Sequence, residues 1–553
     1  MLLLALPGLA QNYTAPSTAV VGSENTVTSN PPVPRPNTTP CVVQLFSNLN
    51  FADFTPKFFT YTPPADCPGP WAAVVLNADW SIDAGRQFDR TAEIWIGATN
   101  VYFGTTAEPS HNVSRSWHIE SNLTDYSPLF EAVQSGRVDL GNLVNPTYTS
   151  VIHGSAYLQF YPPAQLQKAP RTADVVLPMS ASSTGGTVSL NGTSDQLSAT
   201  FTLPTNIERA YLDVFSQSQS TDEFWYTCAP SDVANELGQN CPSTGFREAE
   251  VSLDGVPAGV APVYPWIYTG GIDPYLWRPI PGVHTLNFEP YRVDLTPFAG
   301  VLSNGSSHTV AVNVFNADNY FSETATLLLY LDANSTRVTG EVTENTIGQP
   351  SPTVSEKLKV TSTDVSGTVT VRSNRDLVVE GWVQTSHGRV DTKVSESIDF
   401  NNAQKYYVTT DGSVFDQSVD QMTSISQTVV TRNSDHDIAV RVKQASWPLK
   451  LTYDFTLNPD QSFTQNTTLS QTLNRLFIDI RNGIPVYYSA YSDSVSPTDN
   501  LAVNAQGVAT TTNQANREDY SYSDATGACW NETVKAAAGA LTSVSGGSCQ
   551  HGH

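Results

Sequence analysis

The residues most suited to chemistry lie in one short segment, Gly85-Arg86-Gln87-Phe88-Asp89-Arg90, which runs into the strand-like Thr91-Ala92-Glu93-Ile94-Trp95-Ile96. If residues 89–96 form one strand, alternate side chains share a face, so Asp89, Glu93 and Trp95 lie together and Arg90 lies opposite. Two carboxylates held on a rigid strand beside an aromatic ring suit acid/base catalysis on a sugar-bearing substrate. The alternative is an ordinary strand edge whose charges are solvated.

A second group of candidates lies farther along the chain. Glu223 and Trp225 belong to a polar stretch, and Arg247 and Glu248 open a strand-like run that ends at the hairpin signal Asp254-Gly255. This strand begins with an arginine beside an acid, as the first one does. Acids at matching edges of two neighbouring β domains could converge in the cleft between them, where binding sites commonly occur. Two purely structural Arg–carboxylate pairs are the alternative.

A third group occupies residues 265–280, a stretch rich in Gly and Pro that holds Trp266, Trp277 and Arg278. Aromatic faces on a loop can stack against the C–H faces of sugars, and an arginine can bind their hydroxyls. The alternative is a loop that buries its aromatic rings in the core.

Other catalytic schemes find little support. The sequence has no Gly-x-Ser-x-Gly elbow, no His-Glu-x-x-His helix and no phosphate-binding glycine loop. No Cys-x-x-Cys pair exists, which argues against zinc, and the nine histidines are scattered. We therefore expect chemistry that runs on carboxylates, without a metal or other cofactor.

The net charge of −24 argues against nucleic acid or an anionic membrane surface as a partner. Residues 1–10 resemble the end of a secretory signal peptide, and no later stretch is apolar for long enough to span a membrane. Six cysteines fit an oxidising compartment, and their proximity in the sequence suggests Cys41–Cys67, Cys228–Cys241 and Cys529–Cys549, although fifteen connectivities are open. Secretion is further supported by nine Asn-x-Ser/Thr sequons, at Asn12, Asn37, Asn112, Asn122, Asn191, Asn304, Asn334, Asn466 and Asn531.

Composition and pattern predict an all-β protein. Low charged content with many Thr, Ser, Val and Tyr residues favours strands, and helical signal is confined to short stretches such as Leu129–Ser135 and Glu532–Leu541. We expect a Pro/Thr-rich leader over residues 11–40 and two consecutive β domains of similar size over 41–163 and 174–335. Clean period-2 alternation predicts a third, antiparallel β domain over 338–553.

Five stretches of this sequence resemble the plant and fungal peptide:N-glycanase A family, the acid-active peptide-N4-(N-acetyl-β-glucosaminyl)asparagine amidases. The matching stretches are Gly85–Arg90, Leu140–Thr149, Gly245–Glu248, Val251–Gly255 and Thr269–Ile280. They cover the first two β blocks well and the last third only loosely. A more distant resemblance links Phe88-Asp89-Arg90, and residues 204–212, to the bacterial peptide:N-glycosidase F.

The resemblance implies two tandem jelly rolls with the site between them. It further implies hydrolysis of the amide that joins Asn to the innermost GlcNAc of an N-glycan, on glycopeptides and glycoproteins, in the secretory pathway. Asp89 matches the principal catalytic acid of the bacterial enzyme, with Arg90 beside it. A second catalytic Glu falls near Ser243, so Glu248 is the nearest acid there, and a third falls near Asn142-Leu143, where no carboxylate exists. The remaining residues expected to bind substrate are Glu93, Asn142, Asn145, Glu223, Trp225, Arg247, Trp266, Trp277 and Arg278.

Two other functions stay open. A glycoside hydrolase would also use paired carboxylates, but would cleave within the chitobiose and leave GlcNAc on Asn. A non-catalytic glycan-binding protein would keep the aromatic loop and tolerate the loss of Asp89.

Overall fold

The computed structural model describes residues 19–239, 241–435 and 437–549. Within them nearly all regular structure is β-strand, and the all-β prediction is confirmed. The expected signal segment over residues 1–10, the Asn12 sequon and the C-terminal histidines lie outside the described residues. Six short helical turns connect the strands: η1 (Thr124–Phe130), η2 (Ser220–Asp222), η3 (Trp225–Thr227), η4 (Pro274–Trp277), η5 (Thr296–Phe298) and α1 (Ala299–Leu302).

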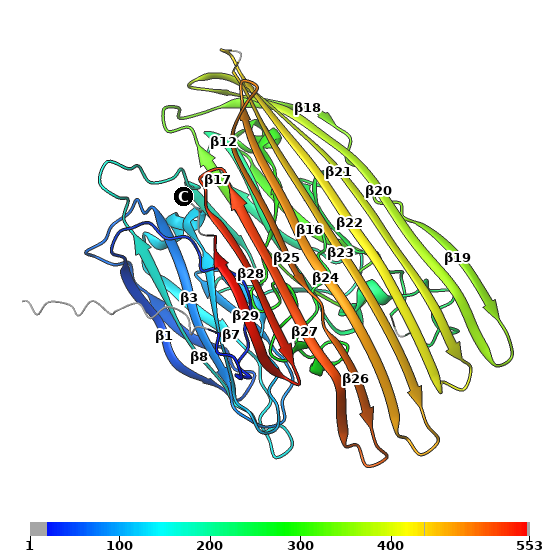
Figure 1. Cartoon of the computed structure of the whole chain (residues 1–553). Coiled ribbons are helices and arrows are strands. Elements are labelled where there is room, and N and C mark those ends of the chain that lie inside the picture. The colour runs from blue at the N-terminus through cyan, green and yellow to red at the C-terminus, as the bar shows by residue number, and fades with distance from the viewer. Residues whose placement is uncertain (1–18, 240, 436, 550–553) are drawn as a thin grey trace, which may run out of the picture.

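The first unit is an eight-stranded sandwich (blue to cyan in Figure 1). One sheet has the order β1-β8-β3-β6 and the facing sheet the order β2-β7-β4-β5, which is the strand order of a jelly roll. Both faces of β4 are buried, because one packs in the sandwich core and the other faces the second unit. The strands are β1 (Cys41–Phe51), β2 (Lys57–Tyr61), β3 (Ala73–Ile82), β4 (Thr91–Ile96), β5 (Thr99–Thr105), β6 (Arg115–Asn122), β7 (Gln134–Asp139) and β8 (Ile152–Tyr161).

The second unit repeats this topology. Its sheets have the orders β10-β17-β12-β15 and β11-β16-β13-β14, with β9 added beside β17. The expected pair of tandem jelly rolls is therefore confirmed by the strand order. The strands are β9 (Val175–Met179), β10 (Val188–Leu190), β11 (Leu197–Thr202), β12 (Ile207–Ser218), β13 (Glu248–Leu253), β14 (Val256–Pro262), β15 (Tyr291–Asp294), β16 (Ser307–Phe315) and β17 (Phe321–Leu331).

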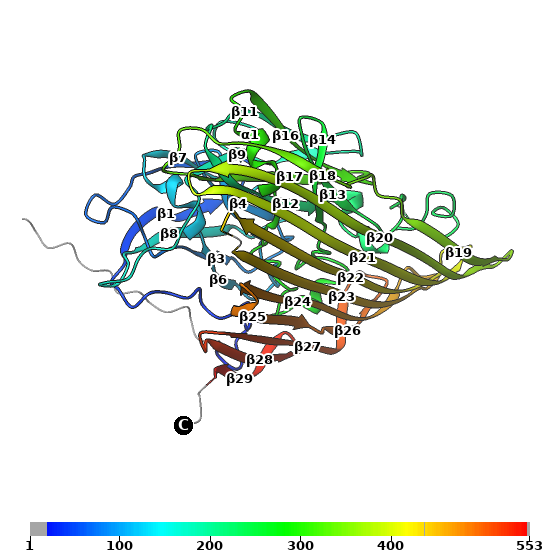
Figure 2. The ribbon, with the colours of Figure 1, turned by 90° about the horizontal axis from the view of Figure 1, so that it is seen from above.

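The third unit is a twelve-stranded antiparallel sheet whose long strands run past both sandwiches (Figures 1 and 2). Its central strands alternate buried and exposed residues, as the period-2 pattern predicts. The helical prediction for Glu532–Leu541 is wrong, because these residues form a hairpin. The strands are β18 (Thr339–Asn345), β19 (Thr353–Val360), β20 (Asp364–Thr385), β21 (Gly388–Thr409), β22 (Val414–Asn433), β23 (Ile438–Leu457), β24 (Phe463–Arg481), β25 (Ile484–Val495), β26 (Thr498–Val503), β27 (Ala509–Asp524), β28 (Cys529–Ala537) and β29 (Ala540–Ser548).

Buried amide side chains join this sheet to the second jelly roll. Gln471 donates to the carbonyl of Pro265 (2.7 Å) and accepts from the N–H of Val283 (3.0 Å). Asn516 donates to the carbonyls of Leu276 and Ile280, both at 2.9 Å. The amides of Asn402, Gln404 and Gln417 bond to carbonyls of residues 226–228 in the same manner. Loops of irregular backbone in the second unit thus have their polar groups satisfied by the third.

The segment before the first strand is extended and crosses from the third unit to the first. Gly22 and Ser23 form a backbone pair with Leu541, and the N–H of Val27 donates to the carbonyl of Pro279 (3.1 Å). Farther along, Arg35 forms an ion pair with Glu120 of β6 (2.7 Å). We call residues 19–35 the strap.

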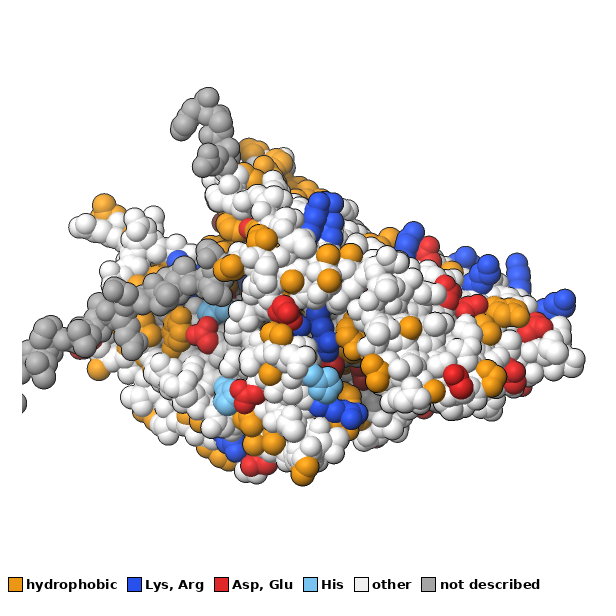
Figure 3. Space-filling model, turned by 60° about the horizontal axis from the view of Figure 1, so that its bottom comes forward, with side chains coloured by type: hydrophobic (Ala, Val, Ile, Leu, Met, Phe, Trp, Pro, Cys, Tyr) orange, Lys and Arg blue, Asp and Glu red, His pale blue; other side chains and the backbone are white. Residues whose placement is uncertain are grey.

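Three disulfides form, Cys41–Cys67, Cys228–Cys241 and Cys529–Cys549, as their sequence proximity suggested. The asparagine of each of the eight sequons within the described residues is exposed to solvent, which is where an oligosaccharide could be attached. No helix of the described chain combines the length and the apolar composition needed to cross a membrane. On the face shown in Figure 3, acidic, basic and histidine side chains gather near the middle.

We predict that Gln471→Leu lowers the free energy of unfolding by about 2–4 kcal/mol, because two buried main-chain groups lose their partner. Chemical denaturation of the variant and the parent protein measures this difference. Gln506→Leu, at an exposed turn, is the matched control and should stay within about 0.5 kcal/mol of the parent. Equal stability of the Gln471 variant would contradict a bridging role for this amide.

Candidate active site

Asp89 lies two residues before β4, in the connection between β3 and β4 of the first sandwich. The N–H of the next residue, Arg90, donates to the hydroxyl of Thr106 (2.9 Å), and the N–H of Thr106 donates back to the carbonyl of Arg90 (2.8 Å). Thr269 of the second unit donates its hydroxyl to the carbonyl of Thr106 (2.7 Å). The segment after β5 therefore holds the Asp89 loop and the loop of residues 263–290 together.

Gly270 of the second unit leaves room for two carboxylates of the first unit, Asp89 and Glu108, at this junction. A Cβ atom on Gly270 would lie 2.3 Å from Oδ1 of Asp89 and 2.7 Å from Oε2 of Glu108, far inside contact distance. A residue with a side chain fits there only if Asp89 and Glu108 move. Arg278, from the same loop, donates to Glu108 (3.3 Å) and to the carbonyl of Pro109 (3.0 Å).

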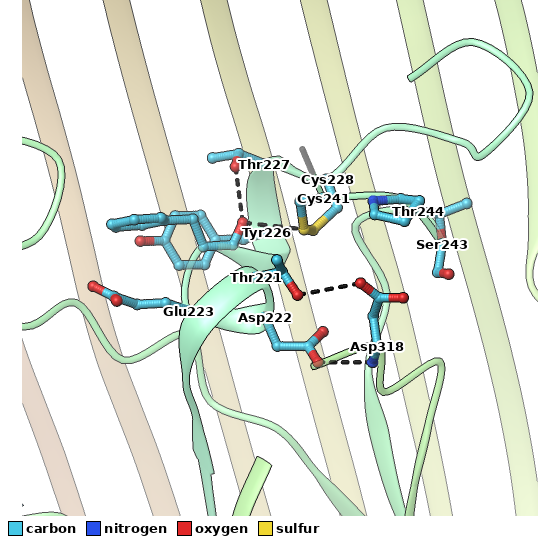
Figure 4. The surroundings of a disulfide bond; sticks show 12 residues. Thr221, Asp222, Glu223, Tyr226, Thr227, Cys228, Cys241, Ser243, Thr244 and Asp318 are labelled. Carbon is cyan, nitrogen blue, oxygen red and sulfur yellow. Dashed lines mark hydrogen bonds between the residues drawn. A yellow bond between two sulfur atoms is a disulfide. The ribbon is translucent and has the colours of Figure 1, made fainter. Parts of the chain in front are cut away.

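Glu223 supplies a third carboxylate from the second unit. It directly follows η2, and its side chain points away from the neighbouring Asp222 (Figure 4). Asp222 points instead to Asp318 and accepts the backbone N–H of that residue at 2.7 Å (Figure 4). The charge of Asp89 acts on Glu223 and on Glu108, which places all three carboxylates in one electrostatic cluster.

Burial and mutual repulsion separate the pKa values of the three groups. Burial raises the pKa of Asp89 to about 6, although the Gly270 N–H and the Arg90 charge oppose the rise. Burial and the charge of Asp89 raise the pKa of Glu223 to about 7. The same two causes raise the pKa of Glu108 to about 8 against the charges of Arg278 and Arg115. Near pH 6–7 one carboxyl group is ionised beside others that still hold a proton, which is the arrangement that general acid/base catalysis requires.

Aromatic side chains flank the carboxylates on the side of the first unit. Phe88 is 46% exposed, and its ring lies 5.4 Å from that of Tyr148. The guanidinium of Arg86 lies over the Tyr148 ring, 5.3 Å from the centroid of that ring. Asn145, one of the residues expected to bind substrate, accepts the N–H groups of Thr147 and Tyr148 and so shapes this loop.

Several residues expected at the site are placed elsewhere by the structure. The three tryptophans, Trp225, Trp266 and Trp277, are at most 8% exposed and pack in the core, so their rings do not offer a free face to a sugar. Asn142 is fully buried and bonds to the carbonyls of Phe51 and Ser150.

The expected acids and arginines of the strands are also engaged in structural contacts. Arg247 forms a fully buried ion pair with Asp222 at 2.8 Å. Glu248 pairs with Arg375 of β20, and the other acids that act on it are Glu250 and Glu396. Glu93 is buried and accepts from Nε1 of Trp95 (2.9 Å). Of the residues predicted from the sequence, the structure brings together Asp89, Arg90, Glu223 and Arg278.

Sequence reasoning missed Glu108, Gly270 and Tyr148. Glu108 stands alone in the sequence, after a buried strand, and no spacing links it to Asp89. Gly270 lies inside a stretch that resembles a known family, but its contact with two carboxylates is visible only in three dimensions. Among the described residues, no group of three or more His, Cys, Asp or Glu side chains is arranged to hold a metal ion.

Comparisons with known proteins identify the family of this chain. The family model of peptide N-acetyl-β-D-glucosaminyl asparaginase amidase A matches residues 30–347, which include both jelly rolls and the whole carboxylate cluster. This chain belongs to that family. It is also 32% identical over 446 residues to the peptide-N4-(N-acetyl-β-glucosaminyl)asparagine amidase A of Prunus dulcis, across 77% of this chain and 76% of that protein. Since 446 residues exceed the span of the family model, this likeness extends into the C-terminal sheet.

Two solved structures show weaker likeness. PNGF-II gives a TM-score of 0.37 at 12% identity, covering 53% of this chain and 66% of its own. PNGase F, a glycosylasparaginase from Flavobacterium meningosepticum, gives 0.35 at 14% identity, covering 53% of this chain and 96% of its own. These scores are too low to carry an argument, and the jelly-roll assignment rests on the strand order.

We predict that Gly270→Ala lowers kcat by about 100-fold, because the new methyl group displaces Asp89 and Glu108 from their positions. Release of glycan from a glycopeptide measures the effect. Gly348→Ala is the control, since nothing lies within 4 Å of a Cβ atom placed there. A Gly270 variant with normal turnover would show that the approach of the two carboxylates does not matter for catalysis.

Proposed function

We propose that this protein is a peptide-N4-(N-acetyl-β-glucosaminyl)asparagine amidase whose reaction takes place at Asp89, Glu108 and Glu223. The family supplies the reaction: hydrolysis of a carbon–nitrogen bond that releases N-glycans from asparagine. The observation that supports the location is the convergence of three carboxylates with raised pKa values at the junction of the two jelly rolls. Several ionisable groups with perturbed pKa values, gathered where two domains meet, are typical of active sites.

In the proposed mechanism Asp89, as the group of lowest pKa, is ionised and accepts a proton from water. That water attacks the side-chain carbonyl carbon of the glycosylated asparagine, and the carbonyl oxygen becomes an oxyanion. Arg90, whose Nε is buried without a partner in the described chain, supplies positive charge beside Asp89. It is suited to hold Asp89 in position and to stabilise the oxyanion.

Glu223 then donates its proton to the departing nitrogen as the carbon–nitrogen bond breaks. The products are aspartate in the peptide and a glycosylamine that hydrolyses to the free glycan. Glu108 keeps its proton to a higher pH and, held by Arg278, is suited to orient the amide. Phe88 and Tyr148 offer ring faces to the innermost sugars in place of the buried tryptophans.

Membership of this family also bears on the substrates of the protein and on its location. N-glycosylated peptides and proteins are the substrates that the family implies. The three disulfides and the exposed sequons support passage through the secretory pathway, and we propose that the protein is secreted and itself glycosylated.

Asp89→Asn should reduce glycan release by about 10²–10⁴-fold, because the base that activates water is lost. Incubation with a glycopeptide followed by mass measurement of the peptide detects the change of Asn to Asp that marks amide hydrolysis. The control Asp83→Asn alters an exposed acid of the same connection and should retain full activity. Cleavage that leaves GlcNAc on asparagine would establish a glycoside hydrolase, and binding without cleavage by the parent protein would establish a lectin.

The pH dependence follows from the same assignments. Asp89 must have lost its proton, so kcat/KM should rise with pH through about 6, and Glu223 must retain its proton, so it should fall through about 7. A profile of kcat/KM from pH 4 to 9 tests this expectation. In Glu223→Gln the alkaline limb should disappear together with most of the activity, whereas Glu236→Gln, at an exposed position, should leave the profile unchanged. An alkaline limb that survives in Glu223→Gln would assign the acid to another group.

A further inference from the structure

One large cavity of the described chain does not contain the carboxylate cluster. It has a volume of about 750 Å³ and lies where the C-terminal sheet, the first jelly roll and the strap meet. Binding sites for small molecules and sugars commonly have volumes of 300–1,000 Å³. A second hollow of about 390 Å³ adjoins it along the same sheet and shares Arg475 as a lining residue.

The sheet wall of the cavity is built by strand register. Gln427 pairs with Lys443, and Lys443 pairs with Phe477, across β22, β23 and β24. In the neighbouring row of paired residues, Arg475 pairs with Tyr491, and Tyr491 pairs with Tyr522, across β24, β25 and β27. Because paired residues share a face, cations and aromatic rings form one continuous surface. Of the aromatic members of this wall, Phe477, Tyr491 and Tyr522 are half-buried and offer part of their rings to the cavity, whereas Trp447 and Tyr520 are buried.

Arg475 and Glu289 are accessible charged groups of the cavity, whereas Lys443 is half-buried. Arg475 pairs with Glu289 and lies 5.7 Å from the centroid of the Tyr491 ring, yet its side chain is 44% exposed and that of Glu289 38%. Lys443 makes no ion pair within the described chain, and burial lowers its pKa despite the nearby charges of Asp294 and Glu396. The side-chain oxygen of Gln427 is buried without a partner there. Hydrogen-bonding groups are thus available to a ligand.

Aromatic faces beside such groups match the chemistry of a carbohydrate, whose C–H faces stack on rings and whose hydroxyls donate and accept hydrogen bonds. A peptide fits this wall less well, because β22, β23, β24 and β25 are each paired on both sides and present no free edge for an added strand. The net charge of −24 disfavours nucleic acid.

One loop connects the cavity to the carboxylate cluster. Residues 263–290 carry Gly270 and Arg278 at the cluster, and Pro281–Pro290 of the same loop form part of the cavity wall. Thr285 accepts from the N–H of Thr105 (2.9 Å), which anchors this end of the loop to the first jelly roll.

We propose that the cavity is an oligosaccharide-binding site that takes the outer sugars of the N-glycan whose asparagine linkage lies at Asp89. The assignment of the outer sugars rests on the proposed amidase function, whereas the binding of oligosaccharide as such does not. Lys443 and Arg475 bind hydroxyls, and the ring of Phe477 stacks on a sugar face.

The test uses the full chain carrying Asp89→Asn and a free high-mannose oligosaccharide as the probe, with binding followed by calorimetry. We expect saturable binding that Lys443→Ala and Phe477→Ala each weaken at least tenfold. Lys450→Ala, on the same strand but 68% exposed and outside the cavity, is the matched control and should bind as the parent does. Phe477→Tyr keeps the ring face and should retain binding, which separates a lost contact from a misfolded sheet.

Hydrolysis by the protein with Asp89 intact distinguishes this proposal from the proposed function. For a glycopeptide with a complete high-mannose glycan, KM should rise at least tenfold in Lys443→Ala. For one with chitobiose alone, it should be unchanged. Absence of oligosaccharide binding, or equal binding by the cavity variants, would overturn the cavity site even if both glycopeptides are hydrolysed. Failure to hydrolyse either glycopeptide would instead overturn the amidase proposal. Binding of free oligosaccharide with no change in KM would show that the cavity serves a glycan other than the one being cleaved.

Discussion

The site depends on hydrogen bonds between buried amide side chains of the C-terminal sheet and the main chain of the loops that form the carboxylate cluster. Residues 263–290 have little regular structure, so their carbonyl and N–H groups need partners from outside the loop. Gln471 and Asn516 supply them from β24 and β27. Asn402, Gln404 and Gln417 do the same for residues 226–228, which follow Glu223. The third unit therefore acts as a rigid frame against which irregular backbone is held in one conformation.

This frame accounts for the electrostatics of the cluster. Three carboxylates repel one another and lose hydration when they are brought together at the junction of the two jelly rolls, and both effects favour the protonated forms. Such an arrangement persists only where the surrounding backbone is well fixed. The Arg278 guanidinium and the Gly270 N–H offset part of the repulsion, so the groups titrate at different pH values rather than together.

The fold class and the period-2 sheet could be predicted from the sequence because both depend on composition and on alternation within single strands. The tandem jelly rolls were expected only from the resemblance to a known family, since strand order is not visible in local alternation. Asp89, Arg90 and Arg278 were found because they belong to ordered stretches of unusual composition. Glu248 was expected to be catalytic because it opens a strand beside an arginine and is the acid nearest to Ser243, where the resemblance places a second catalytic Glu. Its partner Arg375 lies 127 residues away, and no local pattern reveals such a pair.

Other differences between the predictions from the sequence and the structure have the same origin. In the sequence, Trp266 and Trp277 look available for stacking on sugars because they lie in an irregular loop. In the structure they are buried, and the third unit packs on this loop. Glu532–Leu541 has helical composition, with four alanines and one glycine, but pairing with neighbouring strands overrides local propensity. Glu108 enters the site only through the way the segment after β5 is tied to Arg90 and Thr269. In each case, the prediction failed because it depended on a contact between segments that are far apart in the sequence, which local pattern does not reveal.

The strap has a consequence for how the polypeptide reaches its native state. Ser29 donates to Glu518 across 489 residues of chain, and Gly22 pairs with Leu541 in the last strand. Arg115, whose charge acts on Glu108, meanwhile donates to the carbonyl of Glu24 at 2.8 Å. During synthesis the earliest of these residues must wait, unpaired, until almost the whole polypeptide has left the ribosome. Assembly of the environment around Glu108 is thus among the final events of folding, so an incomplete chain would lack it.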